Sequence, residues 1–264
     1  MAGHTASSHS GDRSRAGRPA RTSNPNHVSS GKLDRNSSRE EQHHRTRVGG
    51  SVSRPLIPLK RAVLRYVAIG DSYSIGEGAT PEQSWPALIA QQLRTQGIAI
   101  ELVANPSVTG WTTRQAIDHE LPVFREARPD FATLLTGVND WVQGVGPDEF
   151  RANLNCLVHE MLAVLQQRNR LLLITIPDFS VTPEGPKYAH GRDIAKGIES
   201  FNDIIKEEGN KRSLRVADIF SVSQRMRDDP SRLAVDKLHP SARAYAEWAE
   251  IILPSVRELL RKEQ

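Results

Sequence analysis

Five short apolar runs alternate with longer amphipathic stretches along the chain from residue 64 onwards. Each run has the length of a β-strand, and the expected strands are Leu64–Ile69, Ile98–Ala104, Phe131–Thr136, Leu171–Ile176 and Leu214–Ile219. Strands that alternate with helices predict a parallel sheet covered by helices on both faces. The hydrophobic pattern alone leaves several doubly wound strand orders open.

Apolar residues at helical spacing fill the segments between these runs. They predict helices over Trp85–Leu93, Thr112–Ile117, Pro147 to about Leu165, Asp193 to about Lys211, and from His239-Pro240 to about Leu260. Ser84 is expected to cap the first of these helices, and Trp85 and Cys156 are expected to lie in the core. Residues 177–192 are rich in proline and glycine and are expected to form a loop long enough to shape or cover a site.

The first 61 residues differ in composition from the rest of the chain. Lys and Arg number 12 there against 4 Asp and Glu, whereas the remainder carries 23 basic and 27 acidic residues. Large apolar residues are almost absent before Leu56, so this segment cannot bury enough surface to offset the entropy of ordering it. We therefore expect a disordered basic tail over residues 1–61 and one α/β domain over residues 62–264. The tail has no aromatic residue to stack on bases, so nucleic acid is not an expected partner.

No stretch has the apolar length of a secretory signal or of a transmembrane helix. Cys156 is the only cysteine, which excludes an intrachain disulfide. Both features favour a cytoplasmic protein without a membrane span. The sequence also lacks a phosphate-binding loop, a dinucleotide-binding fingerprint and a zinc motif, so no metal or organic cofactor is expected. The oligomeric state stays open.

Ser72 is a candidate nucleophile because it follows the first apolar run in a glycine-rich turn, Gly70-Asp71-Ser72. A serine hydroxyl is a weak nucleophile unless a base lies within hydrogen-bond reach. His239 is the candidate base, and Asp236, three residues earlier, can reach its Nδ1 in a turn and hold the tautomer that leaves Nε2 free. The turn at Ser72 breaks the Gly-x-Ser-x-Gly pattern of α/β-hydrolases, which argues against that fold.

Two further blocks lie between these segments, Asn105–Gly110 and Gly137-Val138-Asn139-Asp140. In content and order, the four blocks resemble the SGNH hydrolases, also called the GDSL family of esterases and lipases, over residues 64 to about 255. The resemblance implies a three-layer α/β/α sandwich of the flavodoxin-like type with a mainly parallel five-stranded sheet. It also implies a carboxylic ester hydrolase that acts on a small-molecule ester.

The resemblance assigns a role to each site residue. Ser72 is the nucleophile, His239 is the general base and Asp236 orients His239. The backbone N–H groups of Ser72 and Gly110 and the side-chain amide of Asn139 form the oxyanion hole. Glycine is expected at position 110 because a close approach of backbone to substrate tolerates no side chain.

Other residues near these blocks have structural or binding interpretations. Trp111 and Trp141 are candidates to wall the substrate pocket, and packing against neighbouring loops is an equal alternative. Asp71 and Asp140 are expected to brace their turns, and Thr112–Thr113 to cap the helix that follows them.

The substrate is expected to carry a short acyl chain, because no long apolar surface suggests a lipid-binding lid. Three alternatives stay open at this stage. One is an acyltransferase, and another is a carbohydrate O-acetylesterase with the same triad. The third is a non-catalytic binding domain whose basic arm binds nucleic acid or another surface.

Overall fold

The computed structural model describes residues 63–261, so the tail predicted over residues 1–61 lies outside the described residues. The described chain forms a five-stranded sheet in the order β2-β1-β3-β4-β5, and every neighbouring pair of strands is parallel. The strands are β1 (Leu64–Gly70), β2 (Ile100–Ala104), β3 (Phe131–Leu135), β4 (Leu171–Ile174) and β5 (Arg215–Ala217). All five strands predicted from the sequence are confirmed, with shorter ends in most cases.

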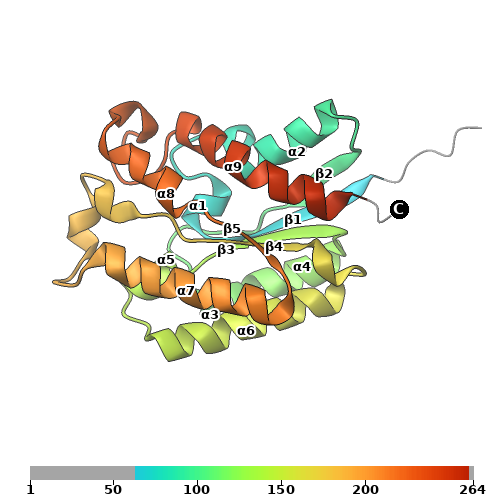
Figure 1. Cartoon of the computed structure of the whole chain (residues 1–264), viewed down its shortest axis with the longest axis horizontal. Helices are drawn as coiled ribbons and strands as arrows, with labels where there is room; N and C mark the ends of the chain where they lie inside the picture. The colour runs from blue at the N-terminus through green and yellow to red at the C-terminus, as the bar shows by residue number, and fades with distance from the viewer. Residues whose placement is uncertain (1–62, 262–264) are drawn as a thin grey trace, which may run out of the picture. The chain divides into compact units, whose positions relative to one another are not determined.

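Helices cover both faces of the sheet (Figure 1). One layer contains α2 (Trp85–Thr95) and α9 (Ala242–Leu260), and the other contains α4 (Leu121–Ala127), α6 (Pro147–Val164) and α7 (Ile194–Arg212). Among the described residues, the short α-helices are α1 (Ser72–Ile75), α3 (Thr113–Gln115), α5 (Val138–Val142) and α8 (Phe220–Ser223), and further single turns of 3-10 helix lie in the loops. The predicted three-layer α/β/α sandwich is confirmed. No helix within residues 63–261 is long and apolar enough to cross a membrane.

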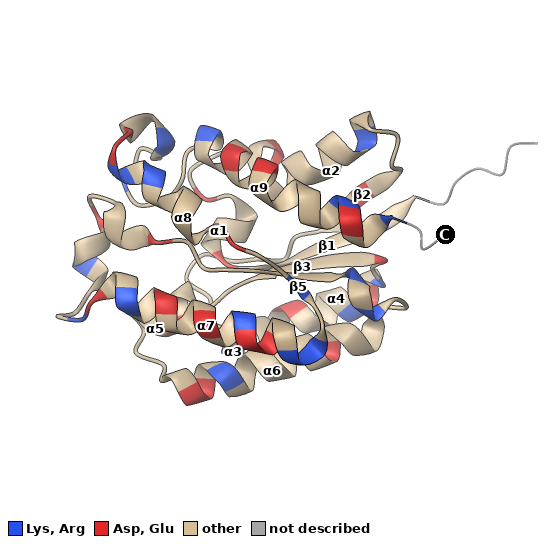
Figure 2. Cartoon of the chain, viewed as in Figure 1, with Lys and Arg blue, Asp and Glu red and all other residues tan. Residues whose placement is uncertain are grey.

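The central strands are apolar throughout because both of their faces are covered. Every residue of β3 and β4 is buried, and charged residues lie mostly on the helices and loops (Figure 2). Trp85 is fully buried on the inner face of α2, as predicted, and its ring N–H donates to the carbonyl of Tyr73 at 3.1 Å. The same bond ties α2 to the turn after β1.

Two helices differ from the sequence prediction. The helix expected over Thr112–Ile117 continues from α3 through a π-helical segment (Ala116–Glu120) into α4. Pro122 has no backbone N–H and would interrupt a regular α-helix, and the wider turn immediately before it accommodates the ring. The last helix begins at Ala242, not at His239-Pro240, because Ser241 occupies the cap position and accepts a bond from the N–H of Ala244.

Two single-residue predictions are wrong. Ser84 occupies the position before α2, but its hydroxyl donates back to the carbonyl of Pro81 at 2.7 Å and does not cap the helix. Cys156 is exposed, because the buried face of α6 runs through its neighbours Leu154 and Leu157.

The turn from β3 into α5 depends on Gly137. Its φ is +121°, and a β-carbon there would lie 2.6 Å from the Phe150 ring and 2.9 Å from Cδ1 of Ile176. Both the backbone conformation and the packing therefore exclude a side chain at this position.

We expect Gly137→Ala to lower the free energy of unfolding by about 3 kcal/mol, the sum of backbone strain and overpacking. Gly144→Ala is the matched control, because φ is +81° there but no atom would lie within 4 Å of a β-carbon. It should cost only about 1 kcal/mol. Urea unfolding of both variants measures the difference, and equal losses would contradict the role of crowding at Gly137.

Candidate active site

The predicted nucleophile and oxyanion residues lie at three neighbouring strand ends. β1 lies between β2 and β3, so the chain connections diverge beside it at the carboxyl edge of the sheet. Ser72 follows β1, Gly110 lies in the loop after β2, and Asn139 lies in α5 after β3. This is the place where open sheets of this strand order bind ligands.

Asp71 shapes the turn that holds Ser72. It is fully buried, and its Oδ1 accepts the backbone N–H of Tyr73 at 3.0 Å, which caps α1. Ser72 thereby becomes the first residue of α1, where a backbone N–H has no partner inside the helix and can donate to a ligand. The bracing role predicted for Asp71 is confirmed.

Side chains from α5 and from the residue that follows it hold the loop after β2. The amide of Asn139 donates to the Trp111 carbonyl at 2.8 Å, and Gln143 donates to the Gly110 carbonyl at 3.0 Å. The Asn139 amide carries a second N–H that the first bond leaves available. Gly110 has φ +85°, and no protein atom would crowd a β-carbon there, so backbone conformation is sufficient to require glycine.

Asp140 also holds the loop after β2 in place, through bonds to Thr113. Its buried carboxylate accepts the backbone N–H of Thr113 at 2.8 Å and also bonds the Thr113 hydroxyl. Thr112 caps α3 in a capping box with Gln115. The predicted bracing by Asp140 and capping by Thr112 are confirmed, whereas Thr113 bonds Asp140 and does not act as a cap.

His239 and Asp236 form a hydrogen-bonded pair. Nδ1 of His239 lies 2.6 Å from Oδ2 of Asp236, whose Oδ1 accepts the backbone N–H groups of Leu238 and His239 at 3.0 and 2.9 Å. Burial alone would raise the pKa of Asp236, but these hydrogen bonds outweigh it and hold the pKa below its usual value. The Asp236 carboxylate therefore stays ionised at neutral pH and can accept the Nδ1 proton of His239.

The His239 ring packs against the turn that holds Ser72. Its centroid lies 5.9 Å from that of Tyr73, the residue after Ser72, in an edge-to-face contact. Within residues 63–261, the Ser72 hydroxyl and the His239 ring share no hydrogen bond. Catalytic hydrogen bonds of this kind are commonly long without substrate.

The loop that carries Asp236 and His239 is closed at its base. Leu233 and Pro240 form an antiparallel bridge, and the backbone N–H of Ser241 donates to the carbonyl of Arg232 at 2.8 Å. The loop therefore leaves and rejoins the domain at one point.

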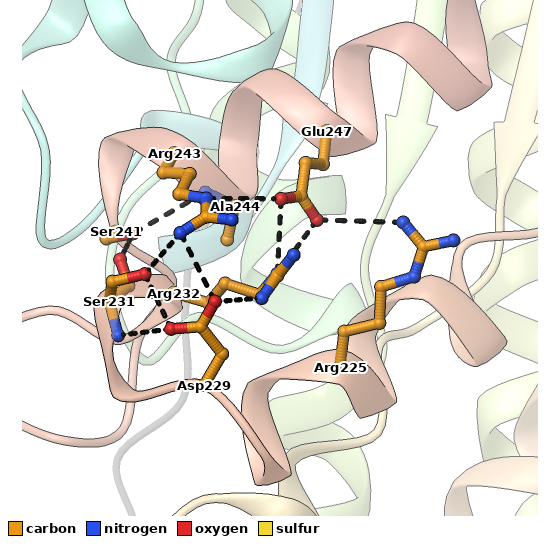
Figure 3. A network of polar contacts seen from close by, with 8 residues as sticks. All are labelled: Arg225, Asp229, Ser231, Arg232, Ser241, Arg243, Ala244 and Glu247. Atoms are coloured by element: carbon orange, nitrogen blue, oxygen red, sulfur yellow. Dashed lines mark hydrogen bonds and ion pairs between the residues drawn. The ribbon is translucent and has the colours of Figure 1, made fainter.

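Ion pairs hold this base together (Figure 3). Arg232 donates to both carboxylate oxygens of Glu247 on α9, at 3.1 and 3.0 Å, and also pairs with Asp229. Arg243 reaches the same two acids, at 3.2 and 3.5 Å. Only 16% of the Arg232 side chain and 20% of the Glu247 side chain are exposed, so this network is less screened by water than isolated surface pairs are. No sequence motif indicated that these residues would form a network of ion pairs.

A second feature that the sequence did not reveal is that the carboxyl of Glu120 is buried together with those of Asp71 and Asp140 around the turn that holds Ser72. Glu120, in the π-helical segment, accepts the backbone N–H of Gly70 at 3.0 Å. Burial raises the pKa of Asp71 and that of Glu120 each to about 8, and their mutual repulsion adds to the effect at Glu120. Burial also raises the pKa of Asp140. Oδ2 of Asp71 and Oε1 of Glu120 have no hydrogen-bond partner among the residues that the structure describes.

The two candidate tryptophans differ in exposure. Trp141 is 5% exposed and packs against Phe179, with the guanidinium of Arg192 4.0 Å above its ring. Trp111 is partly exposed and lies against His119. Packing inside the protein therefore accounts for most of the Trp141 surface, whereas Trp111 retains a face toward solvent.

We expect Glu120→Gln to flatten the pH dependence of stability. Carboxyls whose pKa rises on folding bind protons in the folded state, so the free energy of unfolding falls as pH rises from about 4, the unfolded value, toward 8. A glutamine still accepts the Gly70 N–H but does not titrate. Urea unfolding at pH 5 and pH 8 should show a smaller difference for Glu120→Gln than for wild type. The exposed Glu101→Gln is the control, and an equally flat profile there would contradict the assignment to Glu120.

Two comparisons of sequence agree with this geometry. A model of the GDSL-like lipase/acylhydrolase family matches residues 68–247. An arylesterase of Vibrio mimicus is 23% identical over 189 residues, which span 71% of this chain and 86% of that relative.

Solved structures show the same fold. The lipase/acylhydrolase from Enterococcus faecalis matches with a TM-score of 0.61 at 21% identity, over 76% of this chain and 100% of that one. Axe2, an acetylxylan esterase from Geobacillus stearothermophilus, matches with a TM-score of 0.58 at 20% identity, over 76% of this chain and 97% of that one. The family match spans most of the sheet and every predicted site residue. The chain therefore belongs to the GDSL-like lipase/acylhydrolase family, which confirms the predicted family and its class, the carboxylic ester hydrolases.

Proposed function

We propose that this protein hydrolyses a carboxylic ester with a short acyl chain through an acyl-enzyme on Ser72. The observation that carries the proposal is the 2.6 Å contact between His239 Nδ1 and Asp236 Oδ2, in a loop packed against the nucleophile turn. A carboxylate that bonds Nδ1–H leaves Nε2 of the imidazole able to accept a proton. That is the state a general base requires.

In the first half of the reaction, Ser72 Oγ attacks the carbonyl carbon of the ester while His239 Nε2 takes the hydroxyl proton. The carbonyl oxygen becomes an oxyanion. The unpaired N–H of Ser72, the N–H of Gly110 and the second N–H of Asn139 are the donors that would stabilise it. The C–O bond to the alcohol then breaks, and His239 returns its proton to the alcohol oxygen.

In the second half, water attacks the acyl-enzyme carbonyl and gives a proton to His239. The tetrahedral intermediate collapses, the acid product leaves, and the proton returns to Ser72 Oγ. Asp236 stays ionised throughout and stabilises the imidazolium that forms twice in the cycle.

The packing around α5 supports a short acyl chain. Trp141 is covered by Phe179 and Arg192, and a β-carbon on Gly197 of α7 would lie 1.8 Å from the Trp141 ring nitrogen. Arg192 also donates to the Trp141 and Val142 carbonyls at 2.6 and 3.0 Å. The Trp141 ring is thus enclosed by the protein's own side chains and has little surface to offer a long acyl chain.

We expect Ser72→Ala to retain the fold and to lose ester hydrolysis by at least a factor of about 10³. The assay compares p-nitrophenyl acetate, butyrate and octanoate with wild type and variant side by side. Wild-type kcat/KM should fall as the chain lengthens. Equal turnover by both proteins on all three esters would remove Ser72 from the mechanism.

Asn139→Ala tests the oxyanion hole. One lost donor should lower kcat by about 10²- to 10³-fold and change KM much less, because the bond strengthens in the transition state. Gln143→Ala is the matched control, since it also removes one amide bond to the Gly110–Trp111 turn. A similar loss of kcat in both variants would mean that loop support, and not charge stabilisation, explains the effect.

A further inference from the structure

Asp236 and His239 form a unit that is joined by bonds within their own loop. The Asp236 carboxylate accepts two backbone N–H groups of this loop and lies 2.6 Å from Nδ1 of the His239 ring. These bonds fix the geometry inside the pair, but not its position relative to Ser72. At the tip of the loop, the N–H of Glu184 reaches the Lys237 carbonyl at 3.3 Å, which is long for a hydrogen bond. The position of the pair therefore depends mainly on how the base of the loop is held.

A short backbone ladder joins His239 to Arg232 at this base. The carbonyl of Arg232 accepts the N–H of Ser241 at 2.8 Å, and the carbonyl of His239 accepts the N–H of Ala234, also at 2.8 Å. The antiparallel bridge lies between these two bonds. A shift of Arg232 would therefore be passed on to His239.

The side chain of Arg232 is fixed to α9 by Glu247 (Figure 3). Nε of Arg232 donates to both carboxylate oxygens of Glu247, at 3.1 and 3.0 Å, and Arg243, one turn earlier on α9, pairs with the same carboxylate at 3.5 Å. Both the Arg232 and the Glu247 side chains are mostly covered, so water screens this charge-assisted contact less than it screens an exposed pair. Glu247 thus attaches the base of the loop to α9.

The same turn of α9 contacts the segment that carries Ser72. The hydroxyl of Tyr245 donates to the Glu77 carbonyl at 2.9 Å, and the N–H of Glu77 donates to the Ser72 carbonyl at 2.9 Å. The Trp248 ring packs against that of Tyr73, with centroids 5.8 Å apart, and both Tyr245 and Trp248 are buried. One turn of α9 therefore contacts both the turn that holds Ser72 and the loop that holds the candidate general base.

We propose that Glu247 is a positioning residue for ester hydrolysis, which holds His239 in place against Ser72 through its ion pair with Arg232. The inference rests on the proposed esterase function. Ser72 and His239 come from opposite ends of the domain's sequence, and a small displacement of a catalytic group strongly lowers the rate of the chemical step. Because Glu247 bonds the loop and none of the oxyanion-hole donors, its loss should lower kcat and leave KM nearly unchanged.

The test compares Glu247→Ala with Glu208→Ala, a matched control in the other helical layer. The Glu208 side chain is 5% exposed and pairs with Arg212 one turn away on α7, as Glu247 pairs with Arg243 on α9. With p-nitrophenyl acetate as substrate, kcat should fall about tenfold in Glu247→Ala, and KM should change by less than about twofold. Glu208→Ala should lower the thermal unfolding midpoint at least as much and keep the wild-type kcat.

A conservative variant and a double variant separate positioning from a general loosening of the fold. Glu247→Gln keeps an oxygen that can accept from Arg232, so it should retain more of the wild-type kcat than Glu247→Ala does. Arg232→Met keeps an apolar stem but removes the other partner, and it should lower kcat about as much as Glu247→Ala. If the effect passes through this ion pair, the double variant should again lose about tenfold in kcat, and not the product of the two single losses.

An unchanged kcat in Glu247→Ala, with wild type active and Ser72→Ala inactive, would overturn the positioning role and leave the esterase function intact. An equal loss of kcat in Glu208→Ala, or losses that multiply in the double variant, would overturn it as well. If Glu247→Ala does not fold, Glu247→Gln and Glu208→Gln decide by the same criteria. If wild type and Ser72→Ala are equally inactive on every ester, the esterase function fails first and the inference fails with it.

Discussion

The buried carboxyl of Asp71 is the interaction on which the rest of the site depends. Asp71 directly follows β1, and its carboxyl caps α1. Ser72 is thereby the first residue of this helix, and the Ser72 N–H has no partner inside the helix. The same turn receives the Glu120 carboxyl at the Gly70 N–H and the Trp85 ring at the Tyr73 carbonyl. The π-helical segment and α2 therefore both bond to one short turn, and these hydrogen bonds, which hold the turn in place, are buried from solvent.

This arrangement has an energetic cost. Within residues 63–261, Asp71 and Glu120 are buried without an ion-pair partner, and each retains an oxygen that accepts no hydrogen bond. Their raised pKa values mean that protonation, not ion pairing, relieves the charge. Asp236 behaves in the opposite way, because it accepts three hydrogen bonds and its pKa falls. The domain thus keeps acids neutral around the turn that holds Ser72 and an ionised acid beside His239.

The strand ends could be predicted from the sequence because each combines an apolar run with a polar or glycine-rich turn. Ser72, Gly110 and Asn139 lie at such ends, and the parallel sheet brings them to one edge. Glu120 could not be predicted, because its partner is the Gly70 backbone 50 residues earlier. The Arg232–Glu247 pair could not be predicted either, since charged residues at such positions are ordinarily solvated and only tertiary packing partly buries them.

The two sides of the turn that holds Ser72 differ in packing, which bears on the substrate that the proposed esterase would choose. On the side of β3 and β4, Arg192 and Phe179 cover Trp141, and hydrogen bonds to main-chain carbonyls hold that cover in place. On the side of β1 and β2, a hollow remains, and the Thr109 hydroxyl bonds the Glu77 carboxylate on its wall. In the esterase mechanism proposed above, a site packed around Trp141 and open on the other side would discriminate mainly through the alcohol that leaves. Selectivity of this kind would be expressed in the first half of the reaction, because the alcohol has departed before water attacks.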